Sequence, residues 1–189
     1  AKGDIRTYPL AENLHHQGQL HVSVAPATNV DEALQQQAHD IFTTLADGMD
    51  YVGVLAVELF QVGNTLLVNE LAPRVHNSGH WSQSGAVTSQ FENHLRAVCG
   101  LPLGDTSALG PSAMVNIIGC SSFSRELLSI DGSHLHWYGK SVRDKRKMGH
   151  INVTTDSYHK LGEKLMALSQ YLPLEYFPKL VAEATRLKG

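Results

Sequence analysis

Two glutamates within runs of apolar residues are the side chains of this sequence best suited to chemistry. Glu58 lies in the run Val52–Val62, and Glu70 ends the next run, Thr65–Leu71, directly after Asn69. A lone carboxylate on an apolar face is costly unless it is paired or bound to a cation. Carboxylate oxygens are hard ligands of the kind that magnesium takes together with substrate phosphates. The pair is therefore a candidate divalent-cation site.

The register between the two runs decides whether these glutamates meet. The runs flank Gly63-Asn64, which predicts a hairpin turn. A two-residue turn alone sets Glu58 opposite Asn69 and turns Glu70 to the other face. A three-residue connection, or one bulge, sets Glu58 directly opposite Glu70. The alternative to a cation site is that both carboxylates lie at strand ends in water.

A long polar stretch follows the second glutamate and is the next candidate. It runs from Ala72 to Ala86, longer than most connections in a compact domain. Its arginine presents a planar fork that matches a carboxylate or bicarbonate. Its imidazole, amide, hydroxyl and backbone N–H groups can bind further oxyanion oxygens. The side chains concerned are Arg74, His76, Asn77, Ser78, Gly79 and His80.

Two other interpretations of this stretch remain open. One is a zinc site, because His76 and His80 lie four residues apart. It is disfavoured, because no third ligand lies nearby in the sequence. A surface loop with incidental histidines is the simpler alternative, since the chain contains 11 histidines. Trp81 and His80 can also simply pack beneath the loop.

A basic run forms the third candidate. Gly139–His150 contains five basic side chains and one acidic side chain, Asp144. A solvated loop is the usual explanation for such a run, but lysines and arginines between two strands can also converge on one phosphate. Spacing alone does not choose between these. The basic residues are Lys140, Arg143, Lys145, Arg146 and Lys147.

Periodicity and turn residues predict the strands that position these groups. Alternation and β-branched residues mark short strands, and turns rich in glycine and asparagine separate them. The predicted strands are Asp4–Leu10, Gln19–Val24, Val52–Val62, Thr65–Leu71, Ser112–Ile118, His134–Tyr138 and His150–Val153.

Three helices complete the prediction. The first is capped by Asn29, with Glu32 completing a capping box, and closes at Gly48. The second spans Ser89–Val98, and the third ends before Pro173. Their spacing predicts buried faces made of Phe91, Leu95 and Val98 in the second helix, and of Tyr158, Leu161, Leu165, Leu168 and Leu172 in the third.

Composition excludes several classes of protein. The 189 residues are 42% hydrophobic with a net charge of −3, which excludes general disorder. No apolar run is long enough for a membrane span, and a pI near 6.4 argues against nucleic-acid binding. Two cysteines, Cys99 and Cys120, form no disulfide framework, so we expect a reduced, cytoplasmic location. The class is α+β, with a break near residue 105 in the segment Leu101–Pro111.

Several motifs together resemble one known family. The run NELAPRVHNSGHW at Asn69–Trp81 resembles the ATP-grasp family of N5-carboxyaminoimidazole ribonucleotide synthetases. The likeness continues through YVGVLAVELF at Tyr51–Phe60, SQFENHLRAVCGLPLG at Ser89–Gly104, HLHWYGK at His134–Lys140 and RKMGHIN at Arg146–Asn152. It covers most of the chain in the order that the family shows.

This resemblance implies a fold and a division of the chain. Members of the family are longer, and they begin with a Rossmann-like domain and the ATP-grasp lysines, which do not appear here. We therefore expect residues 1–104 to be the C-terminal part of an ATP-grasp domain. Residues 105–189 are expected to form a small mixed β/α C-terminal domain.

The resemblance also implies a reaction in de novo purine biosynthesis. ATP with Mg²⁺ phosphorylates bicarbonate to carboxyphosphate, which then carboxylates the amino group of aminoimidazole ribonucleotide, with release of ADP and phosphate. The implied partners are thus ATP, bicarbonate and aminoimidazole ribonucleotide, without nucleic acid or membrane. Full-length members are expected to be homodimers.

Roles follow from the resemblance position by position. Glu58 and Glu70 would hold magnesium between the ATP phosphates, with Glu70, Asn69 and His15 in contact with ATP. Arg74 and His76 would fix bicarbonate and stabilise carboxyphosphate, and Lys147 would reach the carboxyl-transfer centre. The substrate-binding residues implied are Asn77, Ser78 and Gly79 in the anion pocket, and Lys140 and Arg146, with Lys147, at the ribonucleotide phosphate.

Two alternative functions remain open at this point. One is the formate-using ATP-grasp formyltransferase of the same pathway. The other is a ligand-binding polypeptide that does not turn over, because half of the ATP site expected in the family is missing. We expect the 189-residue chain by itself to be inactive.

Overall fold

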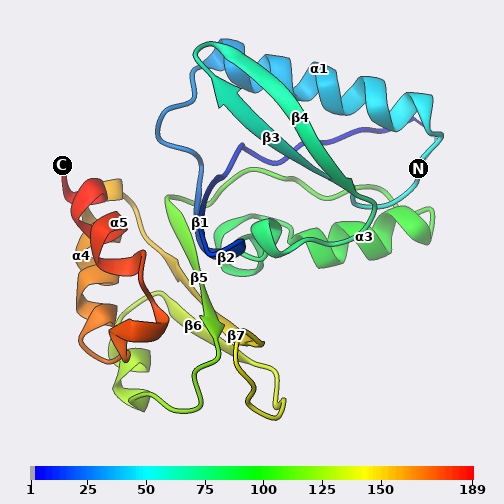
Figure 1. Ribbon diagram of the computed structural model, residues 1–189. Helices are drawn as coiled ribbons and strands as arrows, with labels where there is room; N and C mark the ends of the chain where they lie inside the picture. The colour runs from blue at the N-terminus through cyan, green and yellow to red at the C-terminus, as the bar shows by residue number, and fades with distance from the viewer. Residues whose placement is uncertain (1–2) are drawn as a thin grey trace.

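A five-stranded antiparallel sheet takes strands from both halves of the chain (Figure 1). The structure is a computed structural model and describes residues 3–189. The strand order is β1-β2-β5-β7-β6, so strands far apart in sequence lie side by side. Their bounds are β1 Glu12–His16, β2 Gln19–Ala25, β5 Ser112–Ile118, β6 Ser133–Trp137 and β7 Lys147–Thr154.

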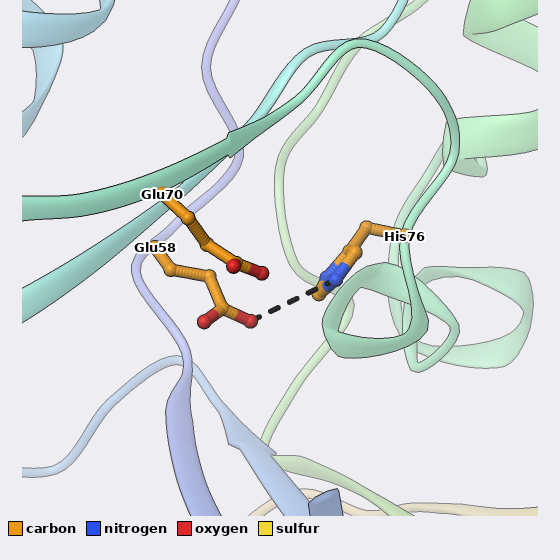
Figure 2. A group of neighbouring side chains, drawn as sticks. All are labelled: Glu58, Glu70 and His76. Atoms are coloured by element: carbon orange, nitrogen blue, oxygen red, sulfur yellow. Dashed lines mark ion pairs between the residues drawn. The ribbon is translucent and has the colours of Figure 1, made fainter.

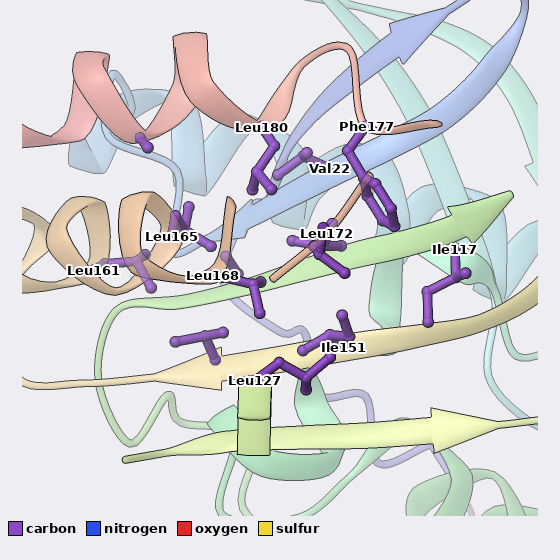
Figure 3. Close-up of a cluster of buried hydrophobic side chains, with 14 of the residues drawn as sticks. Val22, Ile117, Leu127, Ile151, Leu161, Leu165, Leu168, Leu172, Phe177 and Leu180 are labelled. Atoms are coloured by element: carbon purple, nitrogen blue, oxygen red, sulfur yellow. The ribbon is translucent and has the colours of Figure 1, made fainter. Parts of the chain in front are cut away.

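Two helices cover one face of this sheet and form the main core. They are α4 (Tyr158–Ser169) and α5 (Leu180–Lys188). The predicted buried face of α4 is confirmed, because Leu161, Leu165 and Leu168 are all 0% exposed and lie against the strands (Figure 3). Burial of such side chains contributes roughly 1.5–3 kcal/mol each, which makes this the rigid part of the fold.

A network of charges ties the last helix to the edge strand β1. Arg186 donates to the carboxylates of Glu12 at 2.6 Å and Glu183 at 2.5 Å, and to the hydroxyl of Thr28 at 2.8 Å. Glu183 is only 1% exposed, so its carboxylate depends on this guanidinium partner. The arginine thereby fixes the position of β1 against α5.

A two-stranded hairpin lies apart from the main sheet. It consists of β3 (Ala56–Val62) and β4 (Thr65–Ala72), and α1 (Glu32–Gly48) packs along it (Figure 1). Leu66 of β4 packs against α1, and its backbone N–H donates to the side chain of Gln37 at 2.5 Å. The predicted hairpin is confirmed, although its first strand starts at Ala56 and not at Val52.

The remaining elements are short, apart from α3. Two of them interrupt the long polar stretch that follows the hairpin, so this stretch is a folded loop. The bounds are η1 Asn77–Gly79, α2 Ser82–Gly85, α3 Gln90–Val98, η2 Arg125–Ser129 and η3 Leu174–Tyr176.

The first predicted strand, Asp4–Leu10, is wrong. The strand that pairs with β2 is Glu12–His16. The backbone of Leu10 has other partners: its N–H donates to the side chain of Gln35 at 3.0 Å, and its carbonyl accepts from Ala27 at 2.7 Å. Tertiary contacts with the start of α1 therefore determine the backbone path of residues 4–10, which do not pair as a strand.

The predicted cap of the first helix is also wrong. Asp31, not Asn29, is the N-cap, and its carboxylate accepts the backbone N–H of Leu34 at 2.8 Å. Asn29 instead donates to Glu12 at 3.5 Å. Both residue types are good caps, so the choice depends on this contact with β1.

The predicted buried face of α3 is wrong in the same way. Leu95 and Val98 are 62% and 52% exposed, whereas Gln90, Asn93 and Ala97 face inwards. The buried amides are satisfied, because each of them binds backbone groups of neighbouring loops. Polar anchoring of loops, which an apolar pattern cannot reveal, sets the orientation of this helix.

The expected α+β class is confirmed. The proposed division after residue 104 stays a prediction, because β2 and β5 lie on either side of it and pair with each other. Within residues 3–189, no helix has the length and apolar character needed to cross a membrane.

The core on α4 leads to a first prediction. Leu165→Ala should lower the free energy of unfolding by about 2–5 kcal/mol, because it opens a cavity in a fully buried layer. Leu95→Ala is the matched control on an exposed helix face, and it should change stability by less than about 0.5 kcal/mol. Urea denaturation of both variants measures this, and equal losses would contradict the assignment of the core.

Candidate active site

Glu58 and Glu70 lie directly opposite each other on the hairpin (Figure 2). The turn is of the two-residue kind, since Val62 pairs with Thr65. A register shift between Glu58 and Leu59 then leaves Asn69 without a partner in the ladder. Such a bulge restores the opposition that the short turn alone would prevent. The structure therefore adopts the bulged register among the alternatives that the sequence allows.

His76 completes a cluster with the two glutamates. One oxygen from each carboxylate and one ring nitrogen of His76 all lie within 4.8 Å of one another. Nε2 of His76 is 3.7 Å from Glu58, as the dashed line in Figure 2 marks. The backbone N–H of Ser78 donates to Nδ1 at 3.3 Å, so in this arrangement the ring proton is on Nε2 and points towards Glu58.

The charge state of this histidine follows from opposing effects. Burial lowers the pKa of His76 most strongly, while Glu58 raises it and Arg74 lowers it further. The net shift is downward, so the ring is neutral at neutral pH. The cluster therefore contains no full positive charge beside its two carboxylates. Two opposed carboxylates of this kind fit a hard divalent cation.

The loop after the hairpin is held in place by Gln90 of α3. Its side-chain carbonyl accepts the N–H of His76 at 3.0 Å, and its amide donates to the carbonyl of the same residue at 2.7 Å. A Cβ at Gly79 would lie 2.5 Å from the same side chain, so only glycine permits this approach. This contact fixes the backbone of the candidate anion pocket.

His80 and Trp81 lie beneath the loop and support it. Trp81 is 2% exposed and packs edge-on against Tyr8, with 6.2 Å between the ring centroids. Nδ1 of His80 lies 2.8 Å from the amide of Gln90. Burial lowers the pKa of His80 to about 3, which keeps its ring neutral. Their packing role, one of the alternatives open from sequence, is what the structure shows.

The basic segment reaches the same loop through Lys147. Its ammonium donates to the side-chain carbonyl of Asn77. Burial and the nearby Lys140 lower the pKa of Lys147 to about 7. Both ammonium groups lie over the ring of Tyr138, at 5.1 Å for Lys140 and 5.6 Å for Lys147. Segments about seventy residues apart in the chain thus meet at one place.

Other predicted site residues are less closely assembled. Arg74 is exposed and donates to the carbonyl of Val75 at 3.0 Å, and Arg146 donates to Ser141 at 3.0 Å. A cleft of about 1140 Å³ runs along the hairpin and the N-terminal segment. The predicted site residues that line this cleft are His15, Glu58, Asn69, His76, Ser78 and Gly79.

Several polar residues that support the site were not identified from sequence. Tyr138, His150 and Gln83 connect the loop to the sheet through side-chain hydrogen bonds, and Gln90 connects it to α3. Tyr138 and His150 belong to motifs that carry the family resemblance, which was the one signal that could have identified them. Gln90 belongs to another such motif, Ser89–Gly104, whereas Gln83 lies outside all of them and carries no signal in a single sequence.

Comparisons with known proteins agree with this geometry. A family model described as the ATP-grasp domain matches residues 1–91, and one described as the phosphoribosylaminoimidazole carboxylase C-terminal domain matches residues 112–164. The N5-carboxyaminoimidazole ribonucleotide synthase of Vibrio cholerae is 54% identical over 187 residues, which are 98% of this chain and 48% of that protein. The chain belongs to the N5-carboxyaminoimidazole ribonucleotide synthetase family.

Solved structures of this family have the same fold. The synthetase of Thermus thermophilus matches with a TM-score of 0.85 and 56% identity, over 88% of this chain and 46% of that chain. The synthase of Aspergillus clavatus, solved with ADP and 5-aminoimidazole ribonucleotide, matches with a TM-score of 0.79 and 34% identity, over 86% and 46%. The chain spans about half the length of the curated relatives it matches. Enzymes of the ATP-grasp class use ATP with a divalent metal.

The buried imidazole of His150 leads to a second prediction. Burial lowers its pKa from 6.5 to about 2, so below pH 6.5 the unfolded chain binds a proton that the folded chain does not. Stability is therefore lost as the pH falls below 6.5, by at most about 1.4 kcal/mol per unit, or about 2 kcal/mol at pH 5.

The variant His150→Gln should remove this part of the acid sensitivity. Urea denaturation at pH 7 and pH 5 measures it, as the difference in free energy of unfolding between the two pH values. His134→Gln, a change to an exposed histidine, is the control and should keep the wild-type difference. An unchanged difference in His150→Gln would contradict the burial argument.

Proposed function

We propose that this chain takes part in the ATP-dependent carboxylation of 5-aminoimidazole ribonucleotide by bicarbonate, through carboxyphosphate, in de novo purine biosynthesis. The product is N5-carboxyaminoimidazole ribonucleotide. The observation that carries the proposal is the meeting of Glu58, Glu70 and His76 in one cluster, with Lys147 bound to the same loop. Relatives at 45–56% identity carry the name of this synthase, which favours this reaction over the formate-using alternative.

Magnesium is the cation that the hairpin suits best. Glu58 and Glu70 would hold it, because their oxygens face each other from adjacent strands. Bound there, it would neutralise charge on the phosphates of ATP. Asn69, next to Glu70 in the bulge, and His15, in the same cleft, would contact the nucleotide.

The loop supplies groups for an anion next to the cation. Arg74 and His76 would bind bicarbonate and stabilise the negative charge of carboxyphosphate. His76 is already oriented by Ser78, and Gln90 fixes its backbone, so little reorganisation is needed on binding. Asn77, Ser78 and Gly79 would complete the pocket with amide, hydroxyl and backbone groups.

The basic segment would bind the phosphate of the ribonucleotide. Lys140, Arg146 and Lys147 would provide the positive charge. Lys147 contacts the loop of residues 72–86 (the anion loop) through its hydrogen bond to Asn77. An ammonium with a pKa near 7 can hold or release a proton near neutral pH. In this proposal Lys147 would bind substrate and reach the carboxyl-transfer centre.

The organisation of the whole enzyme belongs to the same proposal. Residues 1–104 would be part of the ATP-grasp domain and residues 105–189 the C-terminal domain of a cytoplasmic homodimer. The chain spans about half the length of the relatives that it matches, so these assignments concern the part of the enzyme that its residues form.

Calorimetric titration with 5-aminoimidazole ribonucleotide and with magnesium ATP tests the proposal. Lys147→Ala should weaken binding of the ribonucleotide at least about tenfold, because one charge-assisted contact to phosphate is lost. Binding of ATP should change far less. Arg143→Ala is the control, because it removes one positive charge from an exposed position of the same segment.

Equal losses for both ligands in Lys147→Ala would mean that the lysine has a structural role. An equal loss of ribonucleotide binding in Arg143→Ala would show that net charge, and not the position of Lys147, matters.

A further inference from the structure

The ring of Tyr138 lies close to both lysines of the candidate phosphate site. The residue follows β6 directly, and its backbone N–H donates to Met148 of β7 at 3.0 Å. The ammonium groups of Lys140 and Lys147 are 5.1 and 5.6 Å from the ring centroid. Both distances are within the roughly 6 Å over which an aromatic face attracts a cation. Two like charges are thus held near one ring.

A chain of hydrogen bonds fixes the orientation of this ring. The hydroxyl of Tyr138 lies 2.6 Å from Nδ1 of His150, and Nε2 of His150 lies 2.9 Å from the side-chain carbonyl of Gln83. That carbonyl can only accept, so His150 carries its proton on Nε2 and accepts from the tyrosine on Nδ1. Burial supports this order, since it raises the pKa of Tyr138 to about 12 and lowers that of His150 to about 2.

The middle member of this chain cannot turn away. The ring of His136 stacks on His150 with centroids 4.4 Å apart and 11° between the planes, and His80 lies 4.9 Å away from it. His150 is only 2% exposed. Because Gln83 belongs to α2 and Tyr138 follows β6, these hydrogen bonds connect the anion loop (residues 72–86) to the basic segment (residues 139–150).

We propose that Tyr138 is a positioning residue for Lys140 and Lys147, and that His150 of β7 and Gln83 of α2 set its orientation. The ring holds both ammonium groups close enough together for one phosphate monoester to bind both of them. The proposal deepens the ribonucleotide site of the proposed function and rests on it for the identity of the ligand. The placement of the two lysines by Tyr138 is testable without any ligand.

The environment of Lys147 gives the readout. Lys140 faces it from the connection between β6 and β7, His76 and His80 face it from the anion loop, and His150 lies on its own strand. The three histidines are neutral, so Lys140 and burial dominate the pKa of Lys147, which is about 7. Without the ring, water can enter and the two ammonium groups can separate, and both effects raise that pKa. We expect them to exceed the opposite effect of losing the attraction between the ring and the cation.

Proton titration of the lysine side chains by ¹³C NMR of the full 189-residue chain tests this directly. The resonance of Lys147 is assigned from its absence in Lys147→Met. In the wild type it should titrate near pH 7. In Tyr138→Leu the midpoint should rise by at least about one unit. Tyr176→Leu, a change to a half-exposed tyrosine elsewhere, should leave the midpoint unchanged.

A second variant guards against a folding defect in Tyr138→Leu. Gln83 is exposed and its side chain hydrogen-bonds to His150, so Gln83→Ala should fold normally and release only the far end of the hydrogen-bond chain. It should raise the midpoint of Lys147 by a smaller amount than Tyr138→Leu does. A midpoint unchanged in both variants would overturn the proposal, and a midpoint unchanged only in Gln83→Ala would overturn the role of His150 and Gln83.

Titration with ribose 5-phosphate at pH 6.5 separates this inference from the proposed function. The wild type should bind it, and Tyr138→Leu should bind it roughly five- to tenfold more weakly. A wild type that does not bind, together with a shifted midpoint in Tyr138→Leu, would contradict the phosphate site but support the positioning of the lysines. Equal affinity of both proteins for ribose 5-phosphate would contradict the claim that the phosphate binds to the two lysines that Tyr138 positions.

Discussion

Repulsion between two opposed carboxylates is the constraint around which the candidate site is arranged. Glu58 and Glu70 face each other only because a bulge at Asn69 offsets the register that a two-residue turn imposes. A strand pair gains nothing from two facing negative charges, and such pairs are destabilising without a counter-charge. The neutral ring of His76, 3.7 Å from Glu58, offers a hydrogen-bond donor but no full charge. The arrangement is therefore best explained by a cation that binds during function.

Buried polar side chains hold the other parts of the site to this hairpin. Gln90 binds both backbone groups of His76, and Asn152 of β7 donates to the carbonyl of His80 at 2.9 Å. An unpaired buried amide costs about 1–3 kcal/mol, so each of these contacts strongly favours one placement of the loop. The same loop then receives Lys147 from the far segment. Directional hydrogen bonds from buried side chains, more than the apolar core, thus determine the placement of the site.

Elements whose burial follows from apolar side chains were predictable from sequence. β5 spans Ser112–Ile118 as predicted, and α4 buries the face that its spacing indicates. Elements that depend on polar tertiary contacts were not predictable. The strand expected at Asp4–Leu10 and the buried face expected on α3 are both wrong, because the competing interactions come from side chains such as Gln35 and Asn93.

The candidate site shows the same division. Spacing alone indicated two possible registers of the hairpin, and only the structure shows the bulge that selects one of them. The family resemblance named the residues of the loop and of the basic run. It could not show that Lys147 reaches Asn77, or that two lysines lie over the ring of Tyr138, because both contacts depend on the path of the chain between the sheet and the loop.

The central claim is that the opposed glutamates form a divalent-cation site, and Mn²⁺ binding followed by electron paramagnetic resonance tests it most directly. The 189-residue chain should bind one Mn²⁺, and Glu58→Gln and Glu70→Gln should each weaken binding at least about tenfold, since each removes a charged ligand. Glu126→Gln, a change to an exposed glutamate, should bind as the wild type does. Undiminished Mn²⁺ binding in Glu58→Gln and Glu70→Gln would contradict the account.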